Sequence, residues 1–248
     1  MPFTAAHPAA VLPLLKHSRW FYATGLITGS IAPDFQYFLL LPLFKHSSHT
    51  LEGLLYFNLP VALVLATVFH MVVRRPAVNH LPDWLKGRAL AVPELNWFSY
   101  LKDRWFVFAF SVILGAATHI FWDSFTHETG YFAGKWPVLT SLVDVMGYEI
   151  MLCRIVQHGS TVVGALLILL YTWRQPGAAI PDQVSLQQKC LFWVGIGIAG
   201  IAFIGYALYA STFMRSPMGI VVSFLTGAMM GTIAVSAALK LSWLRKRT

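Results

Sequence analysis

Five apolar runs constrain the fold of this chain more than any other feature. Each is close to the ~20 residues that a helix needs to cross the hydrocarbon of a bilayer. They are Gly53–Val73, Trp105–Trp122, Val156–Trp173, Cys190–Ala210 and Met218–Leu241. Hydrophobic residues make up 57% of the chain and charged residues only 11%, whereas about a quarter of a soluble domain is charged. The runs therefore predict an all-α fold, a polytopic transmembrane helical bundle with five spans.

The N-terminal segment predicts a broken helix or hairpin instead of a sixth span. The stretch Trp20–Leu43 is apolar, but glycine, proline and Asp34 interrupt it, and a basic cluster at Lys16–Arg19 precedes it. From that cluster, the nine residues back to His7 and the fifteen forward to Asp34 reach roughly 14 and 22 Å as helices, so the two side chains can meet. A single span with a cytoplasmic N-terminus is the alternative, and it would place His7 on the opposite side. No signal peptide is expected.

The net charge of +8 is distributed unevenly along the chain. Six cations lie in the segment Arg74–Arg104 and four lie between Lys240 and Arg247, whereas the alternate connections carry one or two each. This bias predicts that the Arg74–Arg104 segment and the C-terminus are cytoplasmic. Anionic lipid headgroups are sufficient partners for these cations, and we expect no binding of nucleic acid.

One stripe of polar residues lies at the end of the second apolar run. His119, Asp123 and His127 are spaced i, i+4 and i+8, so a helix places them on one face with some drift. Two imidazoles and a carboxylate are ligands that a divalent ion such as zinc takes in proteins. The alternative is that these side chains only form hydrogen bonds with neighbouring helices. We favour the metal site, because ionisable residues inside a membrane usually have a function.

The predicted orientation brings further histidines to the same depth. The second run leaves the cytoplasm, so its polar stripe reaches the outer face. The runs that begin near Gly53 and Val156 start at that face, which places His49, Glu52 and His158 there. Ligands of one ion must lie at one depth, so this convergence supports a metal centre near the outer boundary.

Five sequence blocks together resemble a known family. They are Met1–Leu14, Gly29–Phe38, His49–Gly53, Thr118–His127 and Gln157–Thr161. In this order they are similar to an uncharacterised family of bacterial integral membrane proteins, over roughly the first 175 residues. That family is similar in turn to predicted membrane-bound metal-dependent hydrolases and, more distantly, to zinc-dependent phospholipase C.

The resemblance implies a ligand set and a location. The recurring polar pattern of the hydrolase group carries over onto His7, Asp34, His49, His119 and Asp123. The chain departs from the pattern at Phe44, where the hydrolase group tends to have a His-Arg pair, and the nearby His46 is a weaker candidate. A location in the bacterial inner membrane, with the site towards the outer face, is expected.

The combined ligand set predicts one or two divalent ions, with zinc the expected metal. Its seven members are His7, Asp34, His49, His119, Asp123, His127 and His158. They are too many for one tetrahedral ion and suit a di-metal centre, or one ion with further residues orienting its ligands. The expected reaction is hydrolysis of a lipid phosphoester. Glu52, with Asp123, is the predicted catalytic carboxylate, Glu128 is the alternative base, and Lys135 and Arg154 are predicted to bind the substrate phosphate.

The chain divides into a metal-site domain, residues 1–175, and an accessory unit of two transmembrane helices, residues 176–248. Small residues recur in the second part, which predicts close helix packing, homo-oligomerisation or the lining of a lipid groove. Two other classes remain open: a proton- or ion-coupled transporter, and a non-catalytic membrane protein with a structural metal site. The two cysteines, Cys153 and Cys190, give no basis for a disulfide.

Overall fold

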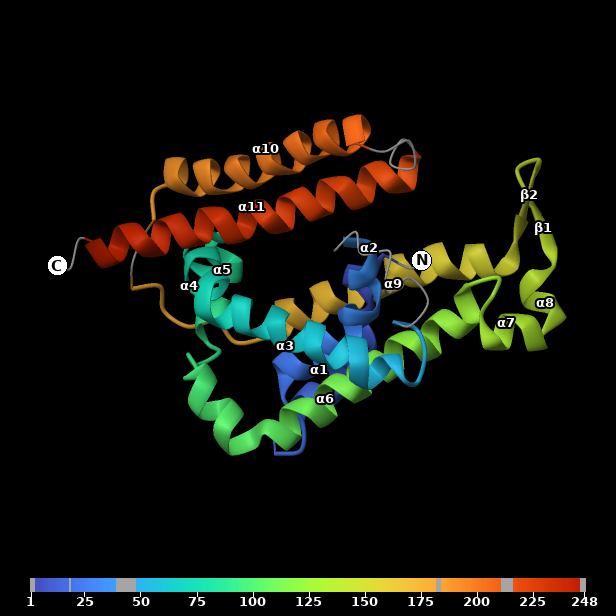
Figure 1. Ribbon diagram of the computed structural model, residues 1–248, viewed down its shortest axis with the longest axis horizontal. Coiled ribbons are helices and arrows are strands. Elements are labelled where there is room, and N and C mark those ends of the chain that lie inside the picture. Colours follow the sequence, from blue (N-terminus) through green and yellow to red (C-terminus); the bar gives the residue numbers. More distant parts are fainter. Residues whose placement is uncertain (1–2, 18, 39–47, 182–183, 211–215, 246–248) are drawn as a thin grey trace. The chain divides into compact units, whose positions relative to one another are not determined.

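The computed structural model describes residues 3–17, 19–38, 48–181, 184–210 and 216–245, and most of these residues are helical (Figure 1). Five helices are long and apolar enough to cross a membrane. They are Leu54–His80, Trp97–Lys135, Leu152–Arg174, Leu186–Ala210 and Pro217–Trp243. The predicted fold class and the five spans are therefore confirmed, and the protein is a multi-pass membrane protein.

The described residues form two compact units, and neither is continuous in sequence. Unit 1 lies within Met1–Gln36, Pro42–Ala66 and Leu101–Arg174. Unit 2 lies within Tyr37–Leu41, Thr67–Tyr100 and Gln175–Thr248. The last segment of unit 2 begins where the second domain was expected, but unit 2 also includes part of the first half of the chain. The division at residue 175 stays a prediction.

Unit 1 contains the N-terminal hairpin, the whole span Leu152–Arg174, most of Trp97–Lys135 and about half of Leu54–His80. Its helical elements are η1 (Thr4–Lys16), α1 (Ala23–Ile31), η2 (Ala32–Asp34), η4 (Leu54–Asn58), most of α3 (Leu59–Val68), most of α6 (Trp97–Thr126), α7 (Tyr131–Lys135), α8 (Pro137–Thr140) and α9 (Leu152–Arg174). The helix η1 is of the 3-10 type and contains two prolines, which a regular α-helix would not accept in its interior. It packs against both α1 and α9.

The hairpin is held against α6 by glycines. The chain turns after η1, and Arg104, where α6 is kinked, donates a hydrogen bond to the carbonyl oxygen of Arg19 at 2.8 Å. A Cβ atom on Gly29 would lie 2.2 Å from the carbonyl oxygen of Val112, and one on Gly115 would lie 2.3 Å from that of Leu26. The backbones of α1 and α6 can approach this closely only because neither residue has a side chain.

A short β-hairpin in unit 1 was not predicted. Strands β1 (Leu142–Val145) and β2 (Tyr148–Met151) pair antiparallel, with Leu142 opposite Met151. Met146 and Gly147 form the two-residue turn, both with positive φ, and the carboxylate of Asp144 accepts a hydrogen bond from the Gly147 amide at 3.1 Å. The hairpin is a small addition to a helical fold.

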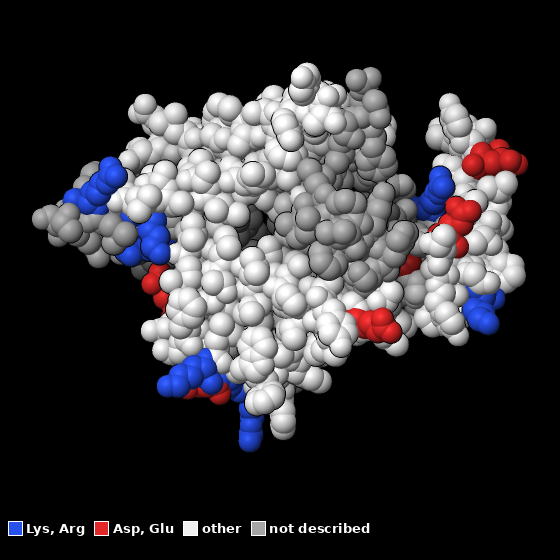
Figure 2. Space-filling view, in the orientation of Figure 1, with Lys and Arg blue, Asp and Glu red and all other residues white. Residues whose placement is uncertain are grey.

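Unit 2 is built around two long helices. They are α10 (Leu186–Ala210) and α11 (Pro217–Arg245), which lie side by side and antiparallel (Figure 1). Shorter elements complete it: α2 (Phe35–Phe38), which straddles both units, η5 (Phe69–Val73), α4 (Arg74–His80) and α5 (Asp83–Leu90). On the face shown in Figure 2, the described surface over α10 and α11 is uncharged until α11 approaches the C-terminus. Such a surface suits contact with lipid.

Candidate metal centre

Four ionisable side chains of unit 1 converge on one point. One atom each from Asp34, His49, His119 and Asp123 lies within 4.8 Å of the corresponding atoms of the other three. Asp34 ends η2, His49 lies in the turn before η4, and the other two are on α6. His49 is partly exposed, whereas the other three are buried. The group is large enough to hold a metal ion.

The hairpin fixes the orientation of His119. Its Nδ1 atom lies 2.7 Å from the carbonyl oxygen of Ser30 in α1. A carbonyl oxygen only accepts hydrogen bonds, so Nδ1 carries the proton and Nε2 presents its lone pair to the group. The close approach of α1 to α6 therefore does more than pack two helices, because it selects the tautomer of a metal ligand.

Asp34 and His49 are held in a similar way. The hydroxyl of Thr4 donates to Oδ2 of Asp34 at 2.6 Å, which leaves Oδ1 directed at the group. That Oδ1 atom lies 3.6 Å from Nε2 of His119 and 3.7 Å from Nε2 of His49. Nδ1 of His49 contacts the hydroxyl of Ser48 at 2.9 Å, so its Nε2 atom also faces inward.

Asp123 lies between two sets of histidines. Its Oδ2 atom is 3.3 Å from Nε2 of His119 and 3.6 Å from Nε2 of His49. Its Oδ1 atom is 3.5 Å from Nε2 of His7 and 3.6 Å from Nδ1 of His127. One carboxylate thus contacts four imidazoles, and its two oxygens face different pairs. This is the geometry of a carboxylate that can bridge two ions.

His7 closes one side of the group. Its ring stacks on that of His119, with the centroids 3.6 Å apart and the planes at 14°. Burial, and then the neighbouring His119, lower the pKa of His7 to about 4. The ring is therefore neutral at physiological pH, which is the form that binds a metal.

The strongest indication of a metal is a set of buried polar atoms that lack hydrogen bonds. Within the described residues, Nε2 of His7, Nε2 of His119, Oδ1 of Asp34 and Oδ1 of Asp123 have no hydrogen-bond partner. An unsatisfied buried polar atom costs about 1–3 kcal/mol, so four in one region would be a large cost without a ligand. One or two cations that accept lone pairs from these atoms would remove that cost. The donor set of imidazole and carboxylate fits a divalent ion such as zinc.

Three of the predicted ligands are outside the group of four: His7, described above, and two further histidines. His127 is half-buried just beyond the end of α6, and its Nδ1 atom is 3.1 Å from the carbonyl oxygen of Asp123. Because that carbonyl can only accept, Nδ1 of His127 in this position donates to the main chain of Asp123. His158 is exposed on α9 and is not part of the group. His46 lies outside the described residues.

Of the residues predicted for catalysis and substrate binding, Asp123 is buried in the group and the others are exposed. Glu52 is exposed three residues after His49, so its role as a base stays a prediction. Arg154 pairs with Glu128 at 3.7 Å, and both side chains are exposed. The ammonium group of Lys135 lies 5.9 Å from the centre of the Tyr131 ring.

Residues that sequence analysis missed support the group from outside. Ser30 and Thr4 orient two ligands, as described above. In the block Gln157–Thr161 the buried side chain is Gln157, not the adjacent histidine. The burial of Gln157 could not be predicted, because the face that a helix buries depends on the elements packed against it, and a five-residue sequence does not identify them.

A small apolar cavity of about 100 Å³ lies beside His7. Residues of η1, α6 and α9 line it, including Ala6, Trp122, Val163 and Leu167. The side chains of Trp122, Val163 and Leu167 are also substantially exposed on the apolar surface. The cavity therefore connects His7 with a surface that suits lipid.

Comparison with protein families gives one match. A family model described as a domain of unknown function, DUF4184, matches residues 1–237. The chain belongs to the DUF4184 family. Neither the curated proteins nor the solved structures give a match. The matched residues include all four members of the buried Asp/His group and nearly all of the five candidate spans.

Proposed function

We propose that this DUF4184 protein is a metal-dependent hydrolase of the bacterial inner membrane that cleaves a phosphoester in a lipid. The observation that carries the proposal is the set of unsatisfied buried atoms on His7, Asp34, His119 and Asp123. In a purely structural helix bundle, buried polar side chains would form hydrogen bonds with one another. Here the imidazole nitrogens and carboxylate oxygens of three pairs, His7–Asp123, His119–Asp34 and His119–Asp123, lie 3.3–3.6 Å apart, which is too long for good charge-assisted hydrogen bonds and suits an inserted ion.

The four-residue group would hold one ion through two imidazoles and two carboxylates. A second ion would use Oδ1 of Asp123 together with His7. A divalent ion in this position supplies charge that polarises a phosphoester oxygen and makes a water molecule more acidic. The protein's own residues hold His119 in one tautomer, place His127 3.6 Å from Oδ1 of Asp123, and exclude bulk water on the side that the His7 ring covers.

A lipid is the substrate class that the surroundings support. The apolar cavity beside His7 lies between η1 and two transmembrane helices, so an acyl or prenyl chain could lie there with its phosphoester at the metal centre. The positive-inside distribution of charge favours an outer-leaflet location for the site. Glu52 is the proposed proton acceptor, and Lys135 and Arg154 are the proposed contacts of the phosphate.

The test begins with elemental analysis of the full-length protein, purified without chelator and reconstituted in lipid nanodiscs. We expect at least one divalent ion per chain, and metal-dependent release of phosphate or of a phosphorylated headgroup from one member of a panel of phospholipids and lipid-linked phosphates. Asp123→Ala should abolish both the bound metal and the turnover. Glu149→Gln, which removes an exposed carboxylate in β2, is the matched control and should change neither.

The possible outcomes separate the components of the proposal. If the protein contains the metal but hydrolyses no lipid in the panel, the site is a structural metal centre. Turnover that survives Asp123→Ala would place the chemistry elsewhere in the chain. A metal-free protein with full stability would contradict the central interpretation of the buried group.

A further inference from the structure

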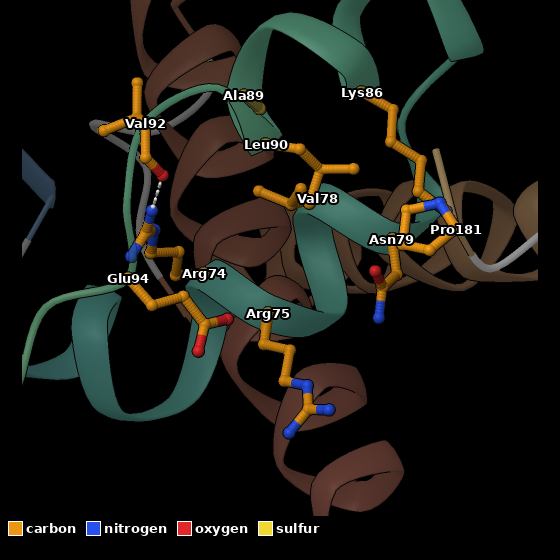
Figure 3. A pocket seen from close by; sticks show the side chains of 10 residues that line it. All are labelled: Arg74, Arg75, Val78, Asn79, Lys86, Ala89, Leu90, Val92, Glu94 and Pro181. Carbon is orange, nitrogen blue, oxygen red and sulfur yellow. Dashed lines mark hydrogen bonds between the residues drawn. The ribbon is translucent and has the colours of Figure 1, made fainter. Parts of the chain in front are cut away.

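A second cavity, with a polar lining, lies in unit 2, mainly in the segment Arg74–Arg104, which carries six of the chain's 18 Lys and Arg residues. It has a volume of about 180 Å³ and is formed by α4, α5, the residues that follow α5, and the linker before α10 (Figure 3). Its charged and polar lining residues are Arg74, Arg75, Asn79, Lys86 and Glu94. None of these belongs to the metal centre, which is in unit 1.

The lining is strongly basic. Three cations and one carboxylate face the cavity, so the charged side chains of its wall sum to +2. Lys86 is only 1% exposed, so one of these cations lies inside the protein and not at its surface. Nearby, the carboxylate of Asp83 accepts a hydrogen bond from Lys189 at 2.6 Å. That bond and the charge of Lys189 lower the pKa of Asp83, and Lys86 adds to the effect.

The two arginines are held in place by the chain around them. Nη2 of Arg74 donates to the carbonyl oxygens of Val92 at 2.6 Å and Pro93 at 2.9 Å; the bond to Val92 is drawn in Figure 3. Among the described residues, the Nε and Nη1 groups of Arg74 have no bond, so donors remain for an anion. The guanidinium of Arg75 lies 5.7 Å from the centre of the Trp243 ring.

The wall of the cavity is also fixed on the side of the linker. The amide of Ala178 donates to the carbonyl oxygen of Gly87 at 2.9 Å, which attaches the linker to α5. A Cβ atom on Gly87 would lie 3.1 Å from the carbonyl oxygen of Ala178, so the contact is tight. Pro181 then contributes to the lining. A fixed basic cavity of this kind has less conformational entropy to lose on binding than a mobile loop.

We propose that this cavity binds a phosphate group, either as the free ion or as the headgroup of an anionic lipid. Arginine guanidinium and lysine ammonium groups form charge-assisted hydrogen bonds with phosphate oxygens, and the volume accommodates a phosphate with a few water molecules. The bias of positive charge predicts that the segment Arg74–Arg104 is cytoplasmic, where anionic headgroups are abundant. The site is therefore separate from the proposed hydrolytic centre and expected on the opposite side of the membrane.

The first arm of the test uses inorganic phosphate with the full-length protein in detergent free of phospholipid, and measures binding by calorimetry. We expect saturable binding that Lys86→Met and Arg75→Gln each weaken by roughly tenfold, since each removes a charged donor. Arg88→Gln is the matched control. Arg88 is on α5 as well, but it bonds to the carbonyl oxygen of Trp84 and does not line the cavity, so its loss should leave the affinity within about twofold.

The second arm uses nanodiscs of phosphatidylcholine with or without phosphatidic acid, and measures the thermal stability of the protein and the lipids that remain bound after extraction. Stabilisation by phosphatidic acid that Arg75→Gln removes, without binding of inorganic phosphate, would identify the lipid as the source of the phosphate. Binding of inorganic phosphate alone would identify the free ion. Arg75 is an exposed residue, so this variant gives a result even if Lys86→Met fails to fold.

Absence of binding in both arms would overturn the proposal, and so would equal weakening by Arg88→Gln and Arg75→Gln. The metal content of each variant provides a separate control. It should stay at the wild-type level, so failure of the phosphate site is distinguishable from failure of the metal centre.

Discussion

Two of the tightest glycine contacts between helices of the described residues differ, because only the first has ionisable side chains beside it. In unit 1, Gly29 and Gly115 bring α1 against α6. In unit 2, a Cβ atom on Gly227 would lie 2.5 Å from the carbonyl oxygen of Ala199, so α11 approaches α10 as closely. The contact between α1 and α6 lies next to the Asp/His group, whereas the contact between α10 and α11 is surrounded by apolar residues and hydroxyl groups.

The difference shows what a small-residue contact contributes in each place. Between α10 and α11 it contributes packing, which is the main source of helix association inside a membrane. Between α1 and α6 it also brings the carbonyl oxygen of Ser30 within 2.7 Å of His119. The same packing device therefore supports stability in one unit and the orientation of a ligand in the other.

The largest expected effect comes from filling the two glycine contacts. Gly115→Val and Gly227→Val should each destabilise the protein by about 3 kcal/mol or more, because a side chain would overlap a backbone carbonyl oxygen. Only Gly115→Val should also release the metal. Thermal unfolding and elemental analysis of both variants test this, with Gly197→Val as control, since a Cβ atom on Gly197 has no neighbour within 4 Å. If folded Gly115→Val keeps the metal content of the wild type, the α1–α6 contact does not orient a ligand and the proposed difference between the two contacts is wrong.

A smaller but more specific effect is expected at the ligands themselves. His119→Ala should weaken metal binding by more than about 100-fold, since loss of an outer partner alone costs roughly 10–100-fold. His158→Ala should leave the affinity within about twofold, because His158 is exposed and outside the group. Competition with a chelator of known affinity measures both. Equal losses in the two variants would show that α9 contributes a ligand after all.

Much of the fold was predictable because span length and charge bias depend on residue type alone. The five apolar runs predicted the five spans, and the basic cluster Lys16–Arg19 predicted the N-terminal hairpin. The β-hairpin was missed, although Met146-Gly147 between alternating residues is a turn signal. Within the site, the four-residue group lies inside the predicted set, because His and Asp are chemically distinctive.

The parts that could not be predicted depend on three-dimensional neighbours. The partner of His119 is a main-chain carbonyl, which every residue possesses, so the identity of Ser30 carries no signal. His127 was placed on the stripe by its spacing, but eight residues of an α-helix accumulate about 80° of drift and the helix ends at Thr126. Which face of α9 is buried was likewise decided by packing against η1.

The next expected effect is on the hydroxyl that orients Asp34. Thr4→Val keeps the shape of the side chain but removes its hydrogen bond to Oδ2. We expect metal affinity to fall by about tenfold, the lower end of the range for outer partners. Thr28→Val is the control, because its hydroxyl bonds only within α1. A loss of the same size at Thr28 would indicate a general effect on the helix.

The smallest expected effect is at the exposed ion pair between Arg154 and Glu128. Because both side chains are more than half exposed, Arg154→Gln should change the free energy of unfolding by less than about 1 kcal/mol. Metal content should not change. Chemical denaturation measures the first quantity and elemental analysis the second. If lipid turnover is detected, an increase in KM for this variant would support the predicted contact with phosphate, whereas unchanged kinetics would remove it.

The long separation in sequence between Asp34 and Asp123 determines when the two residues can meet during synthesis of the protein. The two carboxylates contact the same histidines but are separated by 89 residues of chain. At roughly 5–20 residues per second, the ribosome needs about 4–18 s to synthesise that interval. During this time His7 and Asp34 are already at the membrane without their partners on α6. Capture of the ion is therefore a late event in biogenesis, and a chain that stalls or inserts wrongly before α6 would be left with the carboxylate of Asp34 and the ring of His7 without their partners on α6.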